Sequence, residues 1–223
     1  MDGALTRAAI ARAARRVLER EGLAGLSMRR VAAELDVKAA SLYWHVRNKE
    51  ELLDLLTDEL LTGAEPPPRE GPWRDQFREY CLIHRRLLLS VRDAAKVVGG
   101  RFVLGPNVLR LLEEQLDRLR EAGFTPEDAA LATYTLSSYV QGMVLQEQAP
   151  LAAAETTGTG RGEIAAAAGE QLRGLPAETF PNLVAMADAI SGPAMEARFR
   201  FGLELVLDGL EERLARTRAA AAD

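Results

Sequence analysis

Apolar residues recur at a helical spacing along most of the chain, and no alternating pattern typical of a strand persists anywhere. The first such stretch covers residues 6–21, where arginine and glutamate occupy the side opposite the apolar positions. Thr6 can cap the start of this helix, and Gly22 suits a left-handed end. The pattern predicts an all-α chain whose first helix buries one face, formed by Ile10, Ala13, Ala14, Val17 and Leu18.

Three further helices are predicted directly after the first. The third helix of the chain, at about residues 39–45, has Leu42 and Val46 as its inward anchors. The fourth begins at Asn48, with Glu51 three residues later as the reciprocal partner of a capping box. The second helix is short and carries a stripe at positions i, i+3, i+4 and i+7, formed by Met28, Val31, Ala32 and Leu35.

A proline- and glycine-rich segment, residues 63–72, interrupts the helical pattern. We therefore predict two domains, residues 1–62 and residues 63–223. In the larger domain, residues 156–162 are rich in glycine and threonine and are expected to form a mobile loop. Helices are predicted there at about residues 73–90, 106–123, 126–148, 182–190 and 193–216, with a short helical turn within 93–100.

Two helices of the larger domain have informative faces. The terminal helix is apolar on more than one side, because Phe201 and Leu205 lie away from its main stripe. A helix of this kind must bury more than one face, so we expect its second face to meet a partner chain. The helix that begins at Pro106 is predicted to point four leucines inward: Leu109, Leu112, Leu116 and Leu119.

The composition limits the classes of protein to which the chain can belong. Its 223 residues include one cysteine, Cys81, so no disulfide can form within the chain and an interior thiol is expected. No secretion signal and no apolar stretch of membrane-spanning length is recognisable, which predicts a cytoplasmic protein without a membrane partner. With one Cys and two His, no catalytic set can be assembled, so neither an enzyme nor a cofactor is expected.

The charge distribution is more informative than the net charge of −5. Residues 1–62 hold ten basic and ten acidic side chains, and the rest of the chain carries the acidic excess. Within the balanced part, residues 27–49 contain five basic side chains and two acidic ones. A local positive window in an acidic protein favours phosphate contact at this segment.

Two short helices joined by a tight turn, with a helix ahead of them, are typical of the helix-turn-helix, whose second helix lies in the DNA major groove. Arg29 can reach a guanine or a phosphate, and Lys49 can bind a phosphate together with the first amides of its helix. Trp44 could instead pack into the core, and His45 could face solvent. The predicted DNA-binding residues are Arg29, Lys38, Ala39, Ala40, Ser41, Tyr43, Trp44, His45 and Lys49.

Three strings in this segment form a recognisable motif: GLSMRRVA at residues 25–32, LDV at 35–37 and SLYWHVRNKEELL at 41–53. With them, residues 6–61 resemble the N-terminal domain of the TetR family of repressors. The resemblance to the tetracycline-repressor subgroup continues into the larger domain, with a small insertion near residues 99–106. It is carried by the strings at 73–75, 90–97, 113–116, 122–124 and 201–205.

The resemblance implies a homodimer that binds a palindromic operator and releases it when a small molecule occupies the larger domain. In the family, the helix at 126–148 and the terminal helix would form a four-helix dimer interface. The helix at Asn48–Leu61 would be the lever between the ligand site and DNA. Whether ligand binding releases or captures DNA is left open by the sequence.

The chain departs from the tetracycline repressors at most of the positions that contact the drug. Tyr80 and His84 align with an asparagine and a phenylalanine, while Val98 and Gln146 align with a histidine and an acidic residue that hold the drug's magnesium. Because valine offers no ligand atom to magnesium, the resemblance implies a different and more apolar or aromatic effector. The predicted ligand-binding residues are Tyr80, His84, Val98, Phe102, Val103, Gln115, Met143 and Gln146.

Several alternatives stay open at this point. His84 could be an ordinary hydrogen-bonded interior histidine rather than a ligand contact. Ala39 and Ala40 replace residues that read bases in the tetracycline repressors, so the operator sequence should differ. A DNA-binding regulator without a small-molecule effector is the main alternative function, and a cavity in the larger domain would argue against it.

Overall fold

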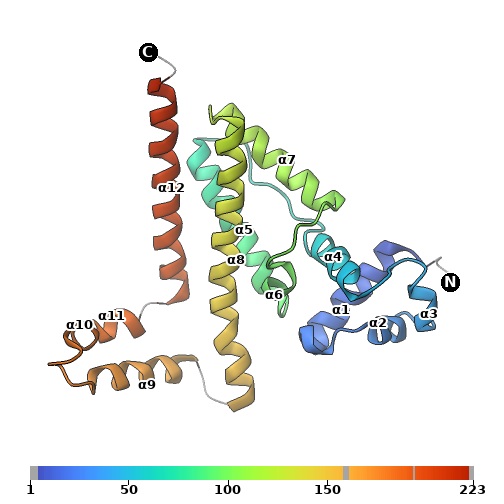
Figure 1. Ribbon diagram of the computed structural model, residues 1–223, viewed down its shortest axis with the longest axis horizontal. Coiled ribbons are helices and arrows are strands. Elements are labelled where there is room, and N and C mark those ends of the chain that lie inside the picture. The colour runs from blue at the N-terminus through green and yellow to red at the C-terminus, as the bar shows by residue number, and fades with distance from the viewer. Residues whose placement is uncertain (1–4, 158–160, 193, 221–223) are drawn as a thin grey trace.

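The computed structural model describes residues 5–157, 161–192 and 194–220, and every regular element in these ranges is a helix. The all-α prediction is confirmed. Figure 1 shows a small helical unit at the N-terminal end of the chain, set against one side of a body of long helices. This unit, which we call the head, consists of α1 (Arg7–Gly25), α2 (Met28–Glu34), α3 (Ala39–Leu42) and α4 (Lys49–Leu60).

The head begins each of its longer helices with a side-chain cap. Thr6 accepts a hydrogen bond from the amide of Ala9 at 3.1 Å, and Asn48 accepts one from the amide of Glu51 at 2.9 Å. The reciprocal half of the Asn48 capping box differs from the prediction. The carboxylate of Glu51 accepts from the amide of Arg47 at 2.8 Å, one residue earlier, because that amide also lies free at the helix entrance.

Helix α3 ends at Leu42, so the prediction that it continues to His45 is wrong. The carbonyl of Leu42 accepts hydrogen bonds from the amides of both His45 and Val46, each at 2.9 Å. Residues 43–45 therefore form a closing turn rather than a further helical turn. This turn brings Val46 back into the core, where it and Leu42 are both fully buried, as predicted for the two anchors.

Removal of the Leu42 side chain tests how strongly the anchors stabilise the head. Leu42→Ala leaves a cavity in a fully buried site, and we expect the free energy of unfolding to fall by about 2–5 kcal/mol. Thermal or urea unfolding followed by circular dichroism measures the change. Leu109→Ala is the matched control, because that leucine is 45% exposed and should change stability by less than about 0.5 kcal/mol.

The body packs several helices around the central α8. Large side chains fill its core, with Phe77, Phe124 and Phe199 at most 1% exposed. Because α5, α7 and α12 all contact α8, the body is one continuous packed unit. Its helices are α5 (Trp73–Ser90), α6 (Ala94–Val98), α7 (Pro106–Glu121), α8 (Pro126–Thr157) and α12 (Met195–Ala220).

The inward face predicted for α7 is only partly correct. Leu119 is buried, and Leu112 and Leu116 are half-buried, but Leu109 is exposed. The C-terminal half of α7 packs into the core, while its N-terminal half stands over open space described below. Leu109 lies on the outer side of that half and therefore meets solvent.

Three shorter helices, α9 (Arg161–Arg173), α10 (Pro181–Ala185) and α11 (Ala187–Ser191), form an arm beside the lower end of α8 in Figure 1. The single helix predicted at 182–190 is thus divided in two at Met186, whose backbone leaves the helical region. The helix predicted to end near residue 148 runs to Thr157. Of the loop predicted at 156–162, residues 158–160 lie outside the described residues, and the flanking positions are helical.

The segment between α4 and α5 is held to the body rather than free. Arg118 of α7 donates hydrogen bonds to the carbonyls of Pro67 at 2.7 Å and Pro68 at 3.2 Å. The division of the chain between residues 62 and 63 stays a prediction. Among the described helices, none combines the length and the apolar character that crossing a membrane requires.

Candidate functional site

The outer surface of the head presents the residues predicted to meet DNA. Arg29 at the start of α2 and Lys49 at the start of α4 are exposed, and neither forms an ion pair with any described residue. Both side chains are therefore available to phosphates. Of the other predicted residues, four are exposed (Lys38, Ala40, Tyr43, Trp44) and three are half-buried (Ala39, Ser41, His45).

The two aromatic residues after α3 point away from the core. Trp44 is 89% exposed and Tyr43 is 53% exposed. The alternative that Trp44 packs inward is thus excluded in this chain. His45 is held more firmly, because its carbonyl accepts a hydrogen bond from Arg7 of α1 at 2.6 Å. The turn after α3 therefore presents two aromatic side chains to solvent.

A cavity of about 620 Å³ lies between α5, α7, α8, the C-terminal end of α4 and the segment that follows α6. Its size is within the range typical of small-molecule sites, and most of its wall is apolar or aromatic. The structure brings six predicted ligand-binding residues together at its wall: Tyr80, His84, Val98, Phe102, Val103 and Gln115. Met143 and Gln146 do not line it, since Met143 packs against the core and Gln146 is exposed.

One wall of the cavity was missed by sequence reasoning. It comes from α8, and several of the residues that α8 contributes are spaced three and four positions apart along the helix. The signal was present in the sequence as a polar stripe on an otherwise apolar helix, and it could have been found by its spacing. The α8 residues at this wall are Ala130, Thr133, Tyr134, Leu136, Ser137, Ser138 and Gln141.

The titratable groups of α5 at the cavity are uncharged at neutral pH. Burial lowers the pKa of His84 to about 4, so its imidazole is neutral. Burial raises the pKa of Tyr80 to about 12 and that of Cys81 to about 12, so the phenol and the thiol both keep their protons. Cys81 is therefore an interior thiol, as predicted, and not a reactive thiolate.

The segment at residues 99–105, which we call the strap, forms another part of the cavity wall and is bound to α4. Arg101 donates hydrogen bonds to the carboxylates of Asp54 at 2.8 Å and Glu50 at 2.5 Å. At the far end of the strap, Asp58 accepts from the amides of Asn107 at 2.9 Å and Val108 at 3.0 Å. Asp58 thus caps the start of α7 from a different helix.

The three α4 carboxylates that hold the strap lie on one face of that helix, because positions 50, 54 and 58 are four residues apart. Lys49 precedes the first of them directly. The cavity wall and the exposed start of α4 are therefore connected by two ion pairs and a helix cap. A second junction joins the head to the body, where Asp93 accepts from the amide of Leu23 at 2.9 Å.

The packed helices α8 and α12 each carry exposed apolar side chains, and we call these residues together the outer face. On α12, Phe201 is 71% exposed and Leu205 is 57% exposed, while Phe199 and Leu203 are buried against the body. The prediction that the terminal helix is apolar on more than one side is confirmed. On α8, the outer face consists of Leu131, Thr135, Gly142 and Leu145, which follow a helical spacing.

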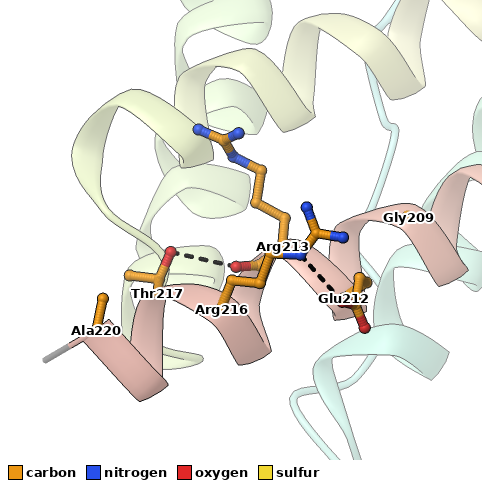
Figure 2. Close-up of a pocket in the computed structure, with 6 residues that line it drawn as sticks. All are labelled: Gly209, Glu212, Arg213, Arg216, Thr217 and Ala220. Carbon is orange, nitrogen blue, oxygen red and sulfur yellow. Dashed lines mark hydrogen bonds and ion pairs between the residues drawn. The ribbon is translucent and has the colours of Figure 1, made fainter. Parts of the chain in front are cut away.

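The outer face continues along α12 into a hollow of about 470 Å³, shown in Figure 2. Arg213 is bound to Asp128 of α8 at 2.6 Å. The hollow has an open, charged wall and holds none of the predicted ligand-binding residues, so we regard it as part of a surface rather than as a ligand site. It is lined by Gly209, Glu212, Arg213, Arg216, Thr217 and Ala220.

Comparison with known proteins matches both parts of the chain. Residues 10–56 match the model of bacterial regulatory proteins of the tetR family, and residues 65–214 match the tetracyclin repressor-like C-terminal domain. The tetracycline repressor protein class C of Escherichia coli is 36% identical over 214 residues, which cover 93% of this chain and 91% of that protein.

Solved structures agree with the sequence matches. Apo ActR from Streptomyces coelicolor has a TM-score of 0.86 and 37% identity, over 97% of this chain and 100% of that one. ActR in complex with actinorhodin has a TM-score of 0.82 and 38% identity, over 94% of this chain and 96% of that one. The matches to both parts of the chain, at this identity over nearly its full length, show that it belongs to the TetR family, as a helix-turn-helix transcriptional repressor with a C-terminal ligand-binding domain of the tetracycline-repressor type.

Proposed function

We propose that this chain is a homodimeric repressor that binds a palindromic operator and leaves it when a small aromatic molecule enters the cavity. One observation carries the proposal: the strap that walls the cavity is bound by Arg101 to α4, the helix that begins at the exposed Lys49. A molecule that moves the strap would therefore move the head. The protein would act in the cytoplasm, where its DNA is.

The DNA contacts follow from the exposed side chains of the head. Lys49 and the first amides of α4 would bind a phosphate and fix the position of the head on the duplex. Arg29 would reach a base edge or a neighbouring phosphate, and Tyr43 and Trp44 would lie against the backbone sugars. Ala39 and Ala40, at the start of α3, would contact thymine methyl groups.

The outer face supports the homodimer. Exposed apolar side chains on two adjacent helices are costly in water, and a second copy that presents the same face would cover them. Gly142 on α8 and Gly209 on α12 leave open space at the positions where a Cβ would stand. Helices of a second copy could therefore approach closely along this surface.

The presence of a cavity favours a regulator that is controlled by an effector. A DNA-binding protein without an effector would function equally well with a solid core, so it would have no need of a cavity. Aromatic side chains from α5, α8 and the strap line it: Phe77, Tyr80, Phe102 and Tyr134. The relative ActR has been solved with actinorhodin bound. We therefore propose that the effector is a multi-ring aromatic metabolite.

Substitution of Lys49 and Arg29 tests the DNA-binding assignment. Lys49→Ala should weaken binding to all duplexes about equally and reduce the slope of log affinity against log salt by about two, one phosphate contact per subunit. Arg29→Ala should also relax the sequence preference of binding. Fluorescence anisotropy with the palindromic operator and a scrambled duplex, at several salt concentrations, measures both effects.

Arg173→Ala is the matched control for these variants. Arg173 is an exposed arginine of α9, paired with Asp188 at 2.5 Å, and it lies on the arm rather than the head. It should leave the salt slope and the sequence preference unchanged. If Lys49→Ala and Arg29→Ala also bind every duplex as the parent does, the assignment of the reading surface is wrong.

A further inference from the structure

Lysine is rare in this chain, and its three positions are close to the features that matter for DNA binding. Of the 28 basic residues, only Lys38, Lys49 and Lys96 are lysines, and the other 25 are arginines. Lys38 directly precedes α3 and Lys49 is the first residue of α4, so both lie on the surface predicted to meet DNA. Lys96 lies in α6, where Asp93 joins the body to the head.

The two lysines of the head have amines that are open to solvent. Lys38 and Lys49 are exposed, and neither forms a hydrogen bond or an ion pair with any described residue. The carboxylates that follow Lys49 along α4 are already occupied, because Glu50 and Glu51 each accept a hydrogen bond from an arginine, at 2.5 Å and 2.6 Å. A reagent in solution therefore meets both amines without displacing a partner.

Lys96 is held in a different way. Its Nζ donates to Oδ1 of Asp93 at 2.7 Å, and its side chain is 39% exposed. The other oxygen of the same carboxylate accepts from the amide of Leu23, and a Cβ placed on Gly22 would stand 2.9 Å from it. The amine of Lys96 must therefore leave an ion pair in a crowded contact before it can react.

Lysine and arginine differ in chemistry as well as in shape. The guanidinium stays protonated and binds phosphate through two parallel hydrogen bonds, which makes arginine the expected choice for phosphate contact in a chain so rich in it. The lysine amine is a nucleophile once it loses a proton, and acyl donors modify it. Acylation removes the positive charge and the attraction to a phosphate, while the arginines keep theirs.

We propose that Lys38 and Lys49 form an acylation site through which an acyl thioester lowers operator affinity independently of the cavity. The ammonium first gives a proton to solvent, and Nζ then attacks the acyl carbon. An N–C bond forms, the C–S bond breaks, and the thiol leaves with the second proton, so each lysine loses one charge. The inference rests on the proposed function, because only a DNA-binding surface turns this loss of charge into a loss of binding.

Acetyl-coenzyme A is the probe, applied to the full-length protein at mildly alkaline pH. Peptide mass spectrometry measures the rate of acetylation at each lysine. Lys38 and Lys49 should react about 2- to 5-fold faster than Lys96, as expected for an amine that must leave a partly exposed ion pair. Bound operator should protect the two lysines of the head and leave the rate at Lys96 unchanged.

The effect on DNA is measured by fluorescence anisotropy before and after treatment. Acetylation of Lys49 in both subunits should weaken operator binding about 10- to 100-fold at about 0.1 M salt and reduce the salt slope by about two. The double variant Lys38→Arg, Lys49→Arg keeps both charges but has no amine at either site, so treatment should not change its affinity from its own starting value. Lys96→Arg is the matched control and should lose affinity by the same factor as the parent.

The inference is overturned if Lys96 reacts first, if bound operator fails to protect the lysines of the head, or if the treated double variant loses as much affinity as the treated parent. Circular dichroism melting checks that the variants are folded. If Lys49→Ala weakens operator binding and acetylation of Lys49 does not, the inference fails and the proposed function stands. If acetylation acts as expected and no cavity ligand releases the operator, the inference stands and control by an effector fails.

Discussion

Glutamates at Phe201 and Leu205 should turn the protein into a monomer and abolish its tight binding to a palindromic operator. Both side chains are exposed on α12, and the opposite side of that helix is buried against the body. Each chain would bring two carboxylates to the two-fold interface. There the carboxylates would lose hydration and repel those of the other chain, which opposes dimer formation. The body core would be untouched, since Leu203 and Leu207 keep their packing.

The loss of operator affinity should be large, because the dimer is what holds two heads on the same operator. A dimer that holds both half-sites gains about 10²- to 10⁴-fold in affinity over one head alone. Analytical ultracentrifugation at micromolar concentration gives the oligomeric state, and anisotropy gives the operator affinity. Leu109→Glu is the control, because Leu109 is an exposed leucine of α7 outside the outer face, and that variant should stay dimeric. A double glutamate variant that remains a dimer would exclude the outer face as the interface.

Removal of the Arg101 guanidinium should uncouple the effector from DNA without preventing either from binding. Arg101→Met keeps the aliphatic part of the side chain against the cavity and loses the bonds to Glu50 and Asp54. In an allosteric regulator the ratio of operator affinities without and with effector is typically about 5- to 150-fold. In the variant this ratio should fall toward one, because the strap can then move without α4.

The measurement compares operator affinity with and without a saturating compound that releases the parent. Because coupling is reciprocal, operator DNA should also lose its effect on the affinity for that compound. Arg86→Met is the control, since Arg86 pairs with Glu79 on the surface of α5 and touches neither the strap nor α4. If Arg101→Met responds to the compound as strongly as the parent does, the coupling runs through other contacts, such as the junction at Asp93.

The head could be predicted from sequence in nearly every detail because its determinants are local. Caps lie within three residues of the amides that they bind, and the anchors Leu42 and Val46 are only four positions apart in the sequence. The C-terminal end of α3 could not be predicted, because the alanine and serine residues of this helix do not indicate where it ends. It depends on how the chain returns Val46 to a core formed by other helices.

The cavity was only partly predictable because its wall is assembled from distant segments. Family alignment indicated the positions on α5 and the strap, which the structure brings together. It also indicated Met143 and Gln146, which the structure places outside the cavity, so their role as ligand contacts stays a prediction. The bond from Arg101 to Asp54 spans 47 residues, and no local pattern reveals a pair at such a separation.

The placement of the two tryptophans has a practical consequence. Trp44 is 89% exposed on the turn after α3, whereas Trp73 lies half-buried with its ring 5.0 Å from that of Phe124. Their emission should differ in wavelength and in access to a quencher such as iodide. We expect red-edge emission to change when an operator binds at the turn, and blue-edge emission to follow the integrity of the body, so the protein would contain its own optical reporter.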